Sequence, residues 1–354
     1  MSFMSMIKYL TISFYYLISI LFWIPTLVAQ QVVTGRITDA TDGKPLLYAS
    51  IFIANTTVGT YSDESGNYKI TIQGEGVYEI VVTYLGYEPF LHKIETPKAL
   101  HQIDIAMKRI DVKMKELIVT PSKNYLKFEK DFFWFKLLGV KPSKSGLEVL
   151  NPEKVNFYMY SEEKVFIAEC DEPIEIINHE MGYHVRYVLQ SFKFDFKTYS
   201  TFIQGQPFFK ELISKNIRQR NNWEKKRQEV YAVSIVHFMR ALYLDQLHEE
   251  GFLLKRLNNF SFPTSSDILQ KNQDMVQVNI DSKMYLACCS KPVTIKMKNS
   301  EYILNNNNSF PLLLLSPQQF SIFPDGTYTG TLIIQEYSKK TISGVSAMLP
   351  LEFK

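Results

Sequence analysis

Short apolar stretches divided by polar turns run through the first third of the chain, up to about residue 108. In two of these stretches apolar and polar residues strictly alternate, which puts one set of side chains on a buried face of a strand and the other in solvent. The alternating apolar positions are Tyr68, Ile70 and Ile72, and Ile103, Ile105 and Met107. Turn signals rich in Asp, Gly and Pro recur at intervals of about 8–12 residues, which is typical of a β-sandwich. The pattern predicts an all-β Greek-key sandwich over residues 30–108.

One turn in this region, Ser62-Asp63-Glu64-Ser65-Gly66-Asn67, carries two carboxylates and raises the question of an ion site. Asp63 can accept hydrogen bonds from backbone N–H groups two or three residues ahead, and Gly66 adopts a left-handed conformation at low cost. A calcium loop needs more oxygen ligands at alternating positions than Asp63 and Glu64 supply. We therefore expect a hairpin turn without a metal.

Beyond a charged connector at residues 109–125, the periodicity changes and strands mix with helices, which predicts an α+β domain over residues 126–354. A short helix is predicted at 128–139, with Phe132, Phe135 and Leu138 inward and Gly139 as its stop. Strands are predicted at residues 155–160, 164–169, 174–178, 183–190 and 192–196.

The strongest helical pattern is one long amphipathic helix of about seven turns, which Asn222 would cap and Gly251 would end. Its apolar face would consist of Val230, Val233, Phe238, Ala241, Leu242 and Leu247. Core packing is the favoured role of this face, and a groove-binding helix is the alternative.

The first 29 residues differ from the rest, because Lys8 is their only charge and an apolar run extends from Tyr9 to about Val28. This is the pattern of a secretory signal peptide cleaved after Ala29, and an uncleaved membrane anchor is the alternative. Elsewhere the composition is that of an ordinary globular protein, with 46% hydrophobic and 21% charged residues and a net charge of +3. The near-neutral charge gives no support for a nucleic-acid partner.

Two short sequence motifs resemble catalytic or metal-binding motifs, but their expected geometry does not fit such a site. His92 and Glu95 have the local H-x-x-E spacing of a zinc carboxypeptidase, but on a predicted strand they would face opposite sides. His179 and His184 are five residues apart with Gly182 between them, which does not fit H-E-x-x-H and indicates a turn with surface histidines.

The remaining histidine and cysteine candidates give no site either. His237 is expected to be a hydrogen-bonded helix residue, and Cys170 has no recognisable base beside it. Cys288 and Cys289 are expected to be buried thiols, with a strained vicinal disulfide as the alternative. We predict no catalytic, cofactor-binding or metal-binding residue and no cofactor. A site built from paired carboxylates stays open, because it has no local signature.

Residues 32–108 resemble the carboxypeptidase regulatory-like domain, a transthyretin-like β-sandwich common in exported proteins of Bacteroidota. The residues that match its pattern in order are Gly35, Pro45, Gly59, Thr60, Asp63, Gly66, Tyr68, Tyr84, Gly86 and Tyr87. The same module precedes the plug of some TonB-dependent transporters, where a strand similar to residues 114–123 often follows it. The remaining chain is too short for a transporter barrel. Residues 32–260 also resemble exported Bacteroidota proteins that carry this domain and have no assigned function.

These resemblances imply an exported, non-enzymatic accessory or interaction protein of the periplasm or the outer membrane surface. The expected partner is another envelope protein or a glycan, and any membrane association would not use a transmembrane helix of the mature chain. The alternatives are a glycan-binding module, which requires exposed aromatic side chains in a concave patch, and a hydrolase with an unrecognised site.

Overall fold

The computed structural model describes residues 30–96, 101–110, 123–141, 146–160, 163–256, 261, 263–272, 275–288, 296–298, 301–303, 312–315, 318–329, 334–336 and 344–353. The predicted signal segment 1–29, residues 114–122 of the strand-like segment 114–123, and Cys289 lie outside the described residues. Among the described residues, no helix combines the length and the apolar character that crossing a membrane requires.

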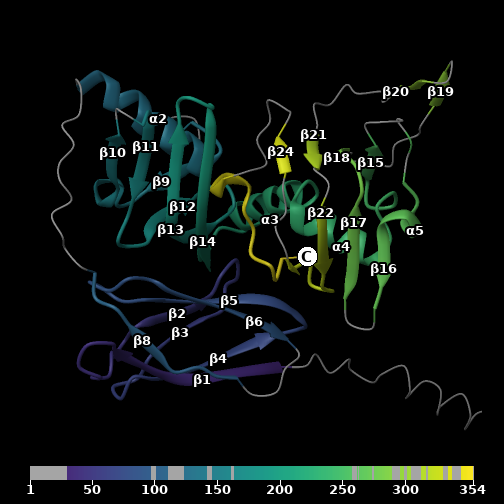
Figure 1. Ribbon diagram of the computed structural model, residues 1–354. Coiled ribbons are helices and arrows are strands. Elements are labelled where there is room, and N and C mark those ends of the chain that lie inside the picture. Colours follow the sequence, from purple (N-terminus) through teal and green to yellow (C-terminus); the bar gives the residue numbers. More distant parts are fainter. Residues whose placement is uncertain are drawn as a thin grey trace, which may run out of the picture.

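The N-terminal part is a sandwich of two four-stranded sheets, as the alternation predicted, and it lies at the bottom of Figure 1. One sheet places β1 (Gln30–Asp39) between antiparallel β4 (Asn67–Gln73) and parallel β7 (His101–Gln102) and β8 (Ile105–Met107). The other has the order β3 (Gly59–Tyr61), β2 (Ser50–Ile53), β5 (Gly76–Thr83) and β6 (Phe90–Thr96). The predicted inward residues Tyr68, Ile70, Ile72, Ile105 and Met107 all lie in the core between the sheets.

A six-stranded antiparallel sheet follows in the chain. Its order is β10 (Asn156–Tyr160), β11 (Val165–Glu169), β13 (Tyr183–Asp195), β12 (Ile174–Asn178) and β9 (Leu147–Val149), and β14 (Ser200–Glu211) pairs with β13. The short η2 (Pro152–Lys154) connects β9 to β10. The two strands predicted at 183–190 and 192–196 are in fact the single strand β13. A register shift between Leu189 and Ser191 lets it continue past the break in the pattern.

The helix α2 (Lys123–Leu138) packs on this sheet and ends before Gly139, as predicted, although it begins five residues earlier. Its inward face includes Leu138, as predicted, but otherwise differs from the prediction. Phe133, Leu137 and Leu138 are fully buried, whereas Phe132 and Phe135 are half-buried. The Phe133 ring meets Phe157 and Phe192 at centroid distances of 5.3 and 4.9 Å, which fixes the rotation of the helix.

The predicted single long helix is two helices, α3 (Ile217–Tyr231) and α4 (Ile235–Leu244). The Asn216 side chain caps α3 by accepting hydrogen bonds from the Arg218 and Gln219 N–H groups. The predicted cap, Asn222, therefore lies inside the helix. The side chain of Ser234 accepts from the His237 N–H and starts α4 three residues after α3 ends. The apolar pattern runs across this break because both helices are partly buried.

The rest of the described chain forms a second core around α4. One four-stranded sheet has the order β15 (Phe252–Arg256), β18 (Met284–Cys288), β21 (Leu312–Leu315) and β24 (Ile334–Glu336). The other has β16 (Leu269–Lys271), β17 (Val276–Ile280), β22 (Gln318–Ile322) and β23 (Tyr328–Thr329). The remaining short elements are α5 (Ser265–Ile268), whose Ile268 joins this core, and the antiparallel pair β19 (Lys296–Lys298) and β20 (Glu301–Ile303). The η3 turn (Val345–Ala347) packs instead against α2, and its Val345 belongs to the core of the six-stranded sheet.

The sandwich is joined to both of these parts. Phe52 of β2 and Phe208 of β14 stack at a centroid distance of 5.0 Å within a small apolar cluster that also contains Val188. The C-terminal end of the chain lies where the three parts meet (Figure 1). There Leu351 N–H donates to the Asn55 carbonyl, and the Glu352 carboxylate accepts from the Thr57 N–H.

Candidate functional site

A cleft of about 610 Å³ separates the sandwich from the six-stranded sheet. A volume in this range suits a small ligand or a few sugar units. Its sandwich wall consists of Tyr48, Ser50, Tyr61, Thr83, Tyr84, Leu85, Tyr87 and Pro89. Its sheet wall consists of Asn151, Asp171, Glu172, Pro173, Glu175, His184, Arg186, Phe208 and Lys210. We call this feature the tyrosine cleft.

The sandwich wall exposes large rings. Tyr48 and Tyr61 are 62% and 65% exposed, in contrast to the aromatic residues that pack in the core. Tyr48 also has a backbone φ of 59°, a left-handed conformation that a bulky residue rarely adopts and that costs about 1–2 kcal/mol. A strained surface residue is a candidate for a functional role, and the exposed Tyr48 ring is accessible to another molecule.

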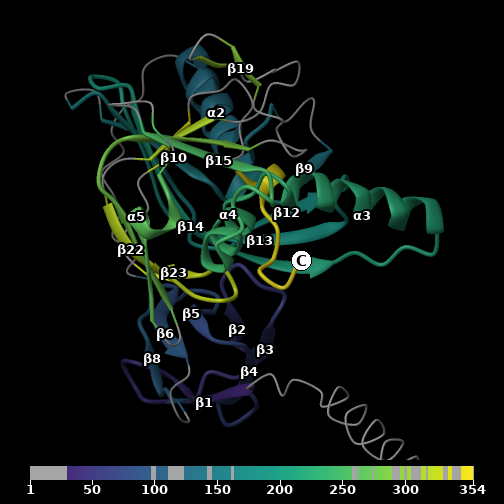
Figure 2. The same cartoon turned by 90° about the vertical axis from the view of Figure 1, so that its right-hand side faces the viewer.

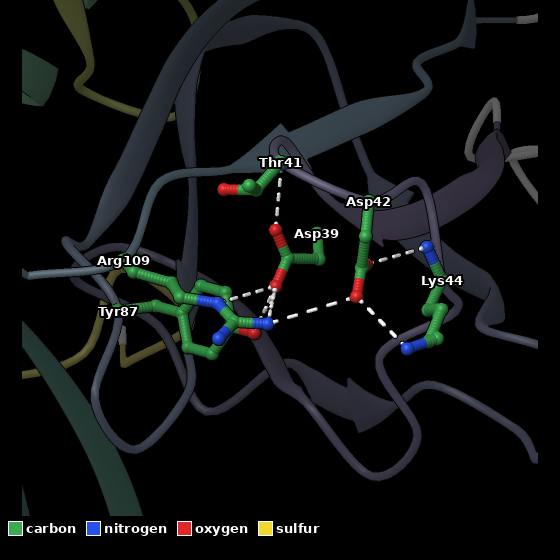
Figure 3. A network of polar contacts seen from close by, with 6 residues as sticks. All are labelled: Asp39, Thr41, Asp42, Lys44, Tyr87 and Arg109. Atoms are coloured by element: carbon green, nitrogen blue, oxygen red, sulfur yellow. Dashed lines mark hydrogen bonds and ion pairs between the residues drawn. The ribbon is translucent and has the colours of Figure 1, made fainter.

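The loop 84–89 supplies the rest of this wall and is held by a buried carboxylate. Asp39, at the end of β1, accepts from the Tyr87 hydroxyl at 2.6 Å, from Arg109 Nε at 2.7 Å and from the Thr41 N–H at 2.6 Å (Figure 3). The pKa of Asp39 lies well below its usual range, and the main cause is the hydrogen bond that the Tyr87 hydroxyl donates to it. The network therefore fixes the Tyr87 ring, which makes a T-shaped contact with the Tyr84 ring at a centroid distance of 5.3 Å.

The sheet wall presents hydrogen-bonding groups. Glu175 on β12 accepts from Arg186 Nε through Oε1 at 3.0 Å. Its Oε2 lies 2.6 Å from His184 Nε2, but these two buried atoms do not have hydrogen-bond geometry. Both partners belong to the neighbouring strand β13. The same arginine donates from Nη1 to the Ser50 hydroxyl of the sandwich at 3.1 Å, so it spans the floor of the cleft. Period two along β13 brings these two side chains to one face, since residues 184 and 186 point the same way.

Acidic and basic groups are balanced in the tyrosine cleft. His184, Arg186 and Lys210 face Asp171, Glu172 and Glu175, and Glu172 is already paired with Lys154 at 2.8 Å. A balanced mixture of donors and acceptors beside aromatic faces suits a neutral, polyhydroxylated ligand better than a phosphate.

The carboxylate segment of the sandwich is a turn, as predicted, but it is not a hairpin, because β3 and β4, which it connects, belong to different sheets. Asp63 Oδ1 accepts from the Ser65 and Asn67 N–H groups at 2.9 and 2.8 Å, and Gly66 has a φ of 80°. The bond from Asn67 is the main cause of the lowered pKa of Asp63. Both carboxylate oxygens are used inside the turn, because Asn67 Nδ2 also lies 3.3 Å from Oδ2.

The histidines considered in the sequence lie in separate places. His92 and Glu95 are both exposed residues of β6, and Lys93 and the buried Ile94 separate them along the strand. His179 lies in the β12–β13 turn and contacts Glu148 at 2.9 Å, whereas His184 belongs to the tyrosine cleft. Within the described residues, no group of three His, Cys, Asp or Glu side chains is arranged to hold a metal ion.

His237 and Cys170 have structural partners. The His237 ring nitrogens lie 3.2 Å from the Ala232 carbonyl and 2.9 Å from Glu250 Oε2, so both are occupied, as expected for a hydrogen-bonded helix residue. Cys170 is a free thiol whose Sγ lies 3.4 Å from the Lys154 carbonyl, and burial raises its pKa.

Sequence reasoning missed the tyrosine cleft as a site. Its residues come from segments that are far apart in the chain, and none has a spacing that a short motif would show. Two signals were available. Tyr84, Gly86 and Tyr87 belong to the family pattern, and Tyr48 follows Pro45 by three residues, close to a segment rich in turn residues.

A curated relative, the TonB-dependent receptor SusC of Bacteroides thetaiotaomicron, is 28% identical over 116 residues. The match covers 33% of this chain and 11% of the receptor, so the chain spans only a small part of that protein.

Among solved structures, a DUF3823 family protein from Bacteroides ovatus is 12% identical and covers 52% of this chain and 83% of its own, with a TM-score of 0.19. A putative carbohydrate binding protein from Bacteroides uniformis is 7% identical and covers 87% of this chain and 99% of its own, also with a TM-score of 0.19. TM-scores this low do not establish a shared overall fold. The family comparison is specific to the sandwich: residues 33–119 match the model of the CarboxypepD_reg-like domain, which confirms the resemblance found in the sequence.

Proposed function

We propose that this chain is a non-enzymatic accessory protein of the bacterial cell envelope that binds a glycan in the tyrosine cleft. The observation that carries the proposal is the grouping of exposed tyrosine rings around one concave surface opposite a wall of hydrogen-bonding side chains. This is the feature that the glycan-binding alternative required.

The chemistry of the two walls matches the two sides of a sugar. The C–H faces of a sugar ring carry partial positive charge and pack on the electron-rich face of an aromatic ring. Sugar hydroxyls are both donors and acceptors, and Asn151, Asp171 and Lys210 offer both kinds of partner. Tyr61 of β3 and Tyr48 supply the platforms because their rings are exposed.

Location in the envelope rests on the sequence. The predicted signal peptide would export the chain, and the similarity to a segment of a TonB-dependent receptor is in keeping with an envelope protein. Binding without catalysis is the part of the proposal that the analysis of cleavage products below tests.

The test is affinity electrophoresis and calorimetry of residues 30–354 with maltohexaose, xylohexaose, cellohexaose and mannohexaose, each also incubated with the protein and analysed for cleavage products. We expect one of these oligosaccharides to bind without being cleaved. Tyr61→Ala should weaken that binding about tenfold, the loss that follows from one stacking contact of about 1.4 kcal/mol. Phe202→Ala, at another exposed ring outside the cleft, is the matched control. If no oligosaccharide of a wider panel binds, or if Tyr61→Ala and Phe202→Ala behave alike, the proposal is wrong.

A further inference from the structure

The segment 211–226, which we call the α3 tip, joins β14 to the middle of α3. It contains the cations Lys215, Arg218, Arg220, Lys225 and Lys226 and the acids Glu211 and Glu224. Its net charge of +3 equals the formal net charge of the entire chain. Figure 2 shows α3 and the segment that enters it extending away from the sheets, so this charge lies on a projection.

The projection is firmly anchored at its base. Trp223 is only 7% exposed and donates from Nε1 to the His179 carbonyl at 2.8 Å. Its ring covers Gly182, where any Cβ would come within 2.3 Å of it. Arg227 donates from Nε to the Met181 carbonyl at 2.8 Å and places its guanidinium 4.0 Å from the centre of the Tyr183 ring. The residues before Trp223 are therefore held outward on a fixed base.

Two aliphatic side chains are exposed on the α3 tip. Ile213 is 97% exposed and Ile217 is 57% exposed. The backbone around them is ordered by hydrogen bonds, because the Ser214 carbonyl accepts from Arg220 at 2.9 Å and Asn216 caps the helix. The isoleucines thus stand in solvent on a defined turn, next to the cations.

The acids of the α3 tip do not neutralise these cations. Glu211 is engaged by Arg227 at 3.1 Å, and Glu224 accepts from Gln228 at 3.2 Å. An anionic partner is therefore favoured, and the exposed isoleucines decide which kind. Nucleic-acid surfaces that bind single strands combine cations with aromatic platforms, whereas interfacial membrane contacts combine cations with aliphatic side chains that enter the headgroup region.

We propose that the α3 tip docks on an anionic lipid surface, with Ile213 and Ile217 entering the headgroup layer and Lys215, Arg218 and Lys225 neutralising lipid charge. This contact is peripheral and uses no membrane-spanning helix. It does not depend on the tyrosine cleft, with which the α3 tip shares no residue.

The test is co-sedimentation of residues 30–354 with vesicles of phosphatidylcholine alone and with vesicles that also contain phosphatidylglycerol. We expect binding to the anionic vesicles only, with an affinity that falls as salt is added. The triple variant Lys215→Gln, Arg218→Gln, Lys225→Gln should weaken binding on the order of 100-fold, since each cation near such a surface contributes about 1 kcal/mol. The matched triple variant Lys69→Gln, Lys108→Gln, Lys193→Gln removes the same charge at exposed positions elsewhere and should change binding less than about threefold.

A second variant separates lipid insertion from charge alone. Ile213→Ser with Ile217→Ser keeps every cation and should weaken vesicle binding about tenfold. These side chains are exposed, so folding is unaffected and circular dichroism should be that of the wild type. Equal binding to both kinds of vesicle, no binding to either, or an unchanged affinity of the isoleucine variant would overturn the proposal. So would displacement from the vesicles by polyglutamate at a charge-equivalent concentration, because the partner would then be an acidic protein.

Discussion

Asp39 and Glu175 are both carboxylates that hold an arginine, yet their surroundings differ. Asp39 is 2% exposed, and its partners Thr41, Tyr87 and Arg109 all come from the sandwich or the residue that follows it. The Glu175 side chain is 25% exposed and binds two residues of β13. One of them, Arg186, reaches across to the sandwich.

The difference lies in what remains for another molecule. Around Asp39 the donors of Thr41, Tyr87 and Arg109 all point to one carboxylate that is itself buried, although the Arg109 side chain is 59% exposed, so the network stabilises the sandwich and fixes the loop that carries Tyr87. Around Glu175 the side chains of His184 and Arg186 keep 27% and 23% of their surface accessible at the edge of the cleft. The same residue types therefore hold a fold together in one place and line a binding surface in the other.

The largest effect is expected from Asp39→Ala, which removes the acceptor shared by Tyr87 and Arg109. The variant loses three hydrogen bonds to a buried, charged acceptor, so we expect it to unfold at a clearly lower urea concentration than any other considered. Asp42→Ala is the control, because its side chain is 33% exposed and it lies 3.8 Å from the same arginine. Equal midpoints for the two variants would contradict the structural role of the Asp39 network.

The pH dependence of stability tests the same carboxylate. Because the pKa of Asp39 in the folded protein is held below the ordinary value of 3.8, its stabilising contribution is present above that value and is lost as the pH falls through and below it. We expect the melting temperature to fall below about pH 5.

In Asp39→Asn this acid dependence should be shallower. It should not disappear, because hydrogen bonds also lower the pKa of Asp63 and Asp195. Melting curves of the variant and the wild type from neutral to acidic pH provide the measurement. Parallel curves would show that Asp39 does not contribute.

Tyr48 and Tyr199 give a matched pair for the binding surface. Both are exposed, with φ values of 59° and 54°, but only Tyr48 lines the tyrosine cleft. Replacing either by Gly should relieve strain and change stability by at most about +1 kcal/mol. Only Tyr48→Gly should weaken oligosaccharide binding, by about tenfold. A loss of binding in Tyr199→Gly would place the binding surface elsewhere.

The smallest effect is expected from Ser50→Ala, which removes the hydroxyl that Arg186 reaches across the cleft floor. One neutral acceptor is lost while Glu175 still holds the arginine, so the free energy of unfolding should fall by about 1 kcal/mol. Urea denaturation measures this change. A loss above about 3 kcal/mol would mean that this bond, rather than the apolar contact of Phe52 with Phe208, joins the two parts.

Local pattern was a good guide to the sandwich and a poor one to the helices. Along β4 the alternation of Tyr68, Ile70 and Ile72 predicted the buried face. Side chains on a strand alternate between its two faces with a period of two, and packing against other elements does not alter that period. The pattern that predicted one long helix contained two, since a serine that caps α4 interrupts the hydrogen bonding without interrupting the apolar spacing. At α2 the helix was expected, but its rotation was set by the rings it meets on the sheet.

The sequence by itself determined the family resemblance of the sandwich, the turn at Asp63 and the hydrogen-bonded state of His237. The first follows a pattern along one continuous segment, and the other two depend on residues close in the chain. The tertiary structure alone decided where Tyr48, Tyr61, Glu175 and Arg186 meet, and that the segment before Trp223 projects with its isoleucines exposed. Contacts between segments that are more than a hundred residues apart leave no spacing in the sequence. They arise only when apolar surfaces such as those of Phe52 and Phe208 bring two folded parts together.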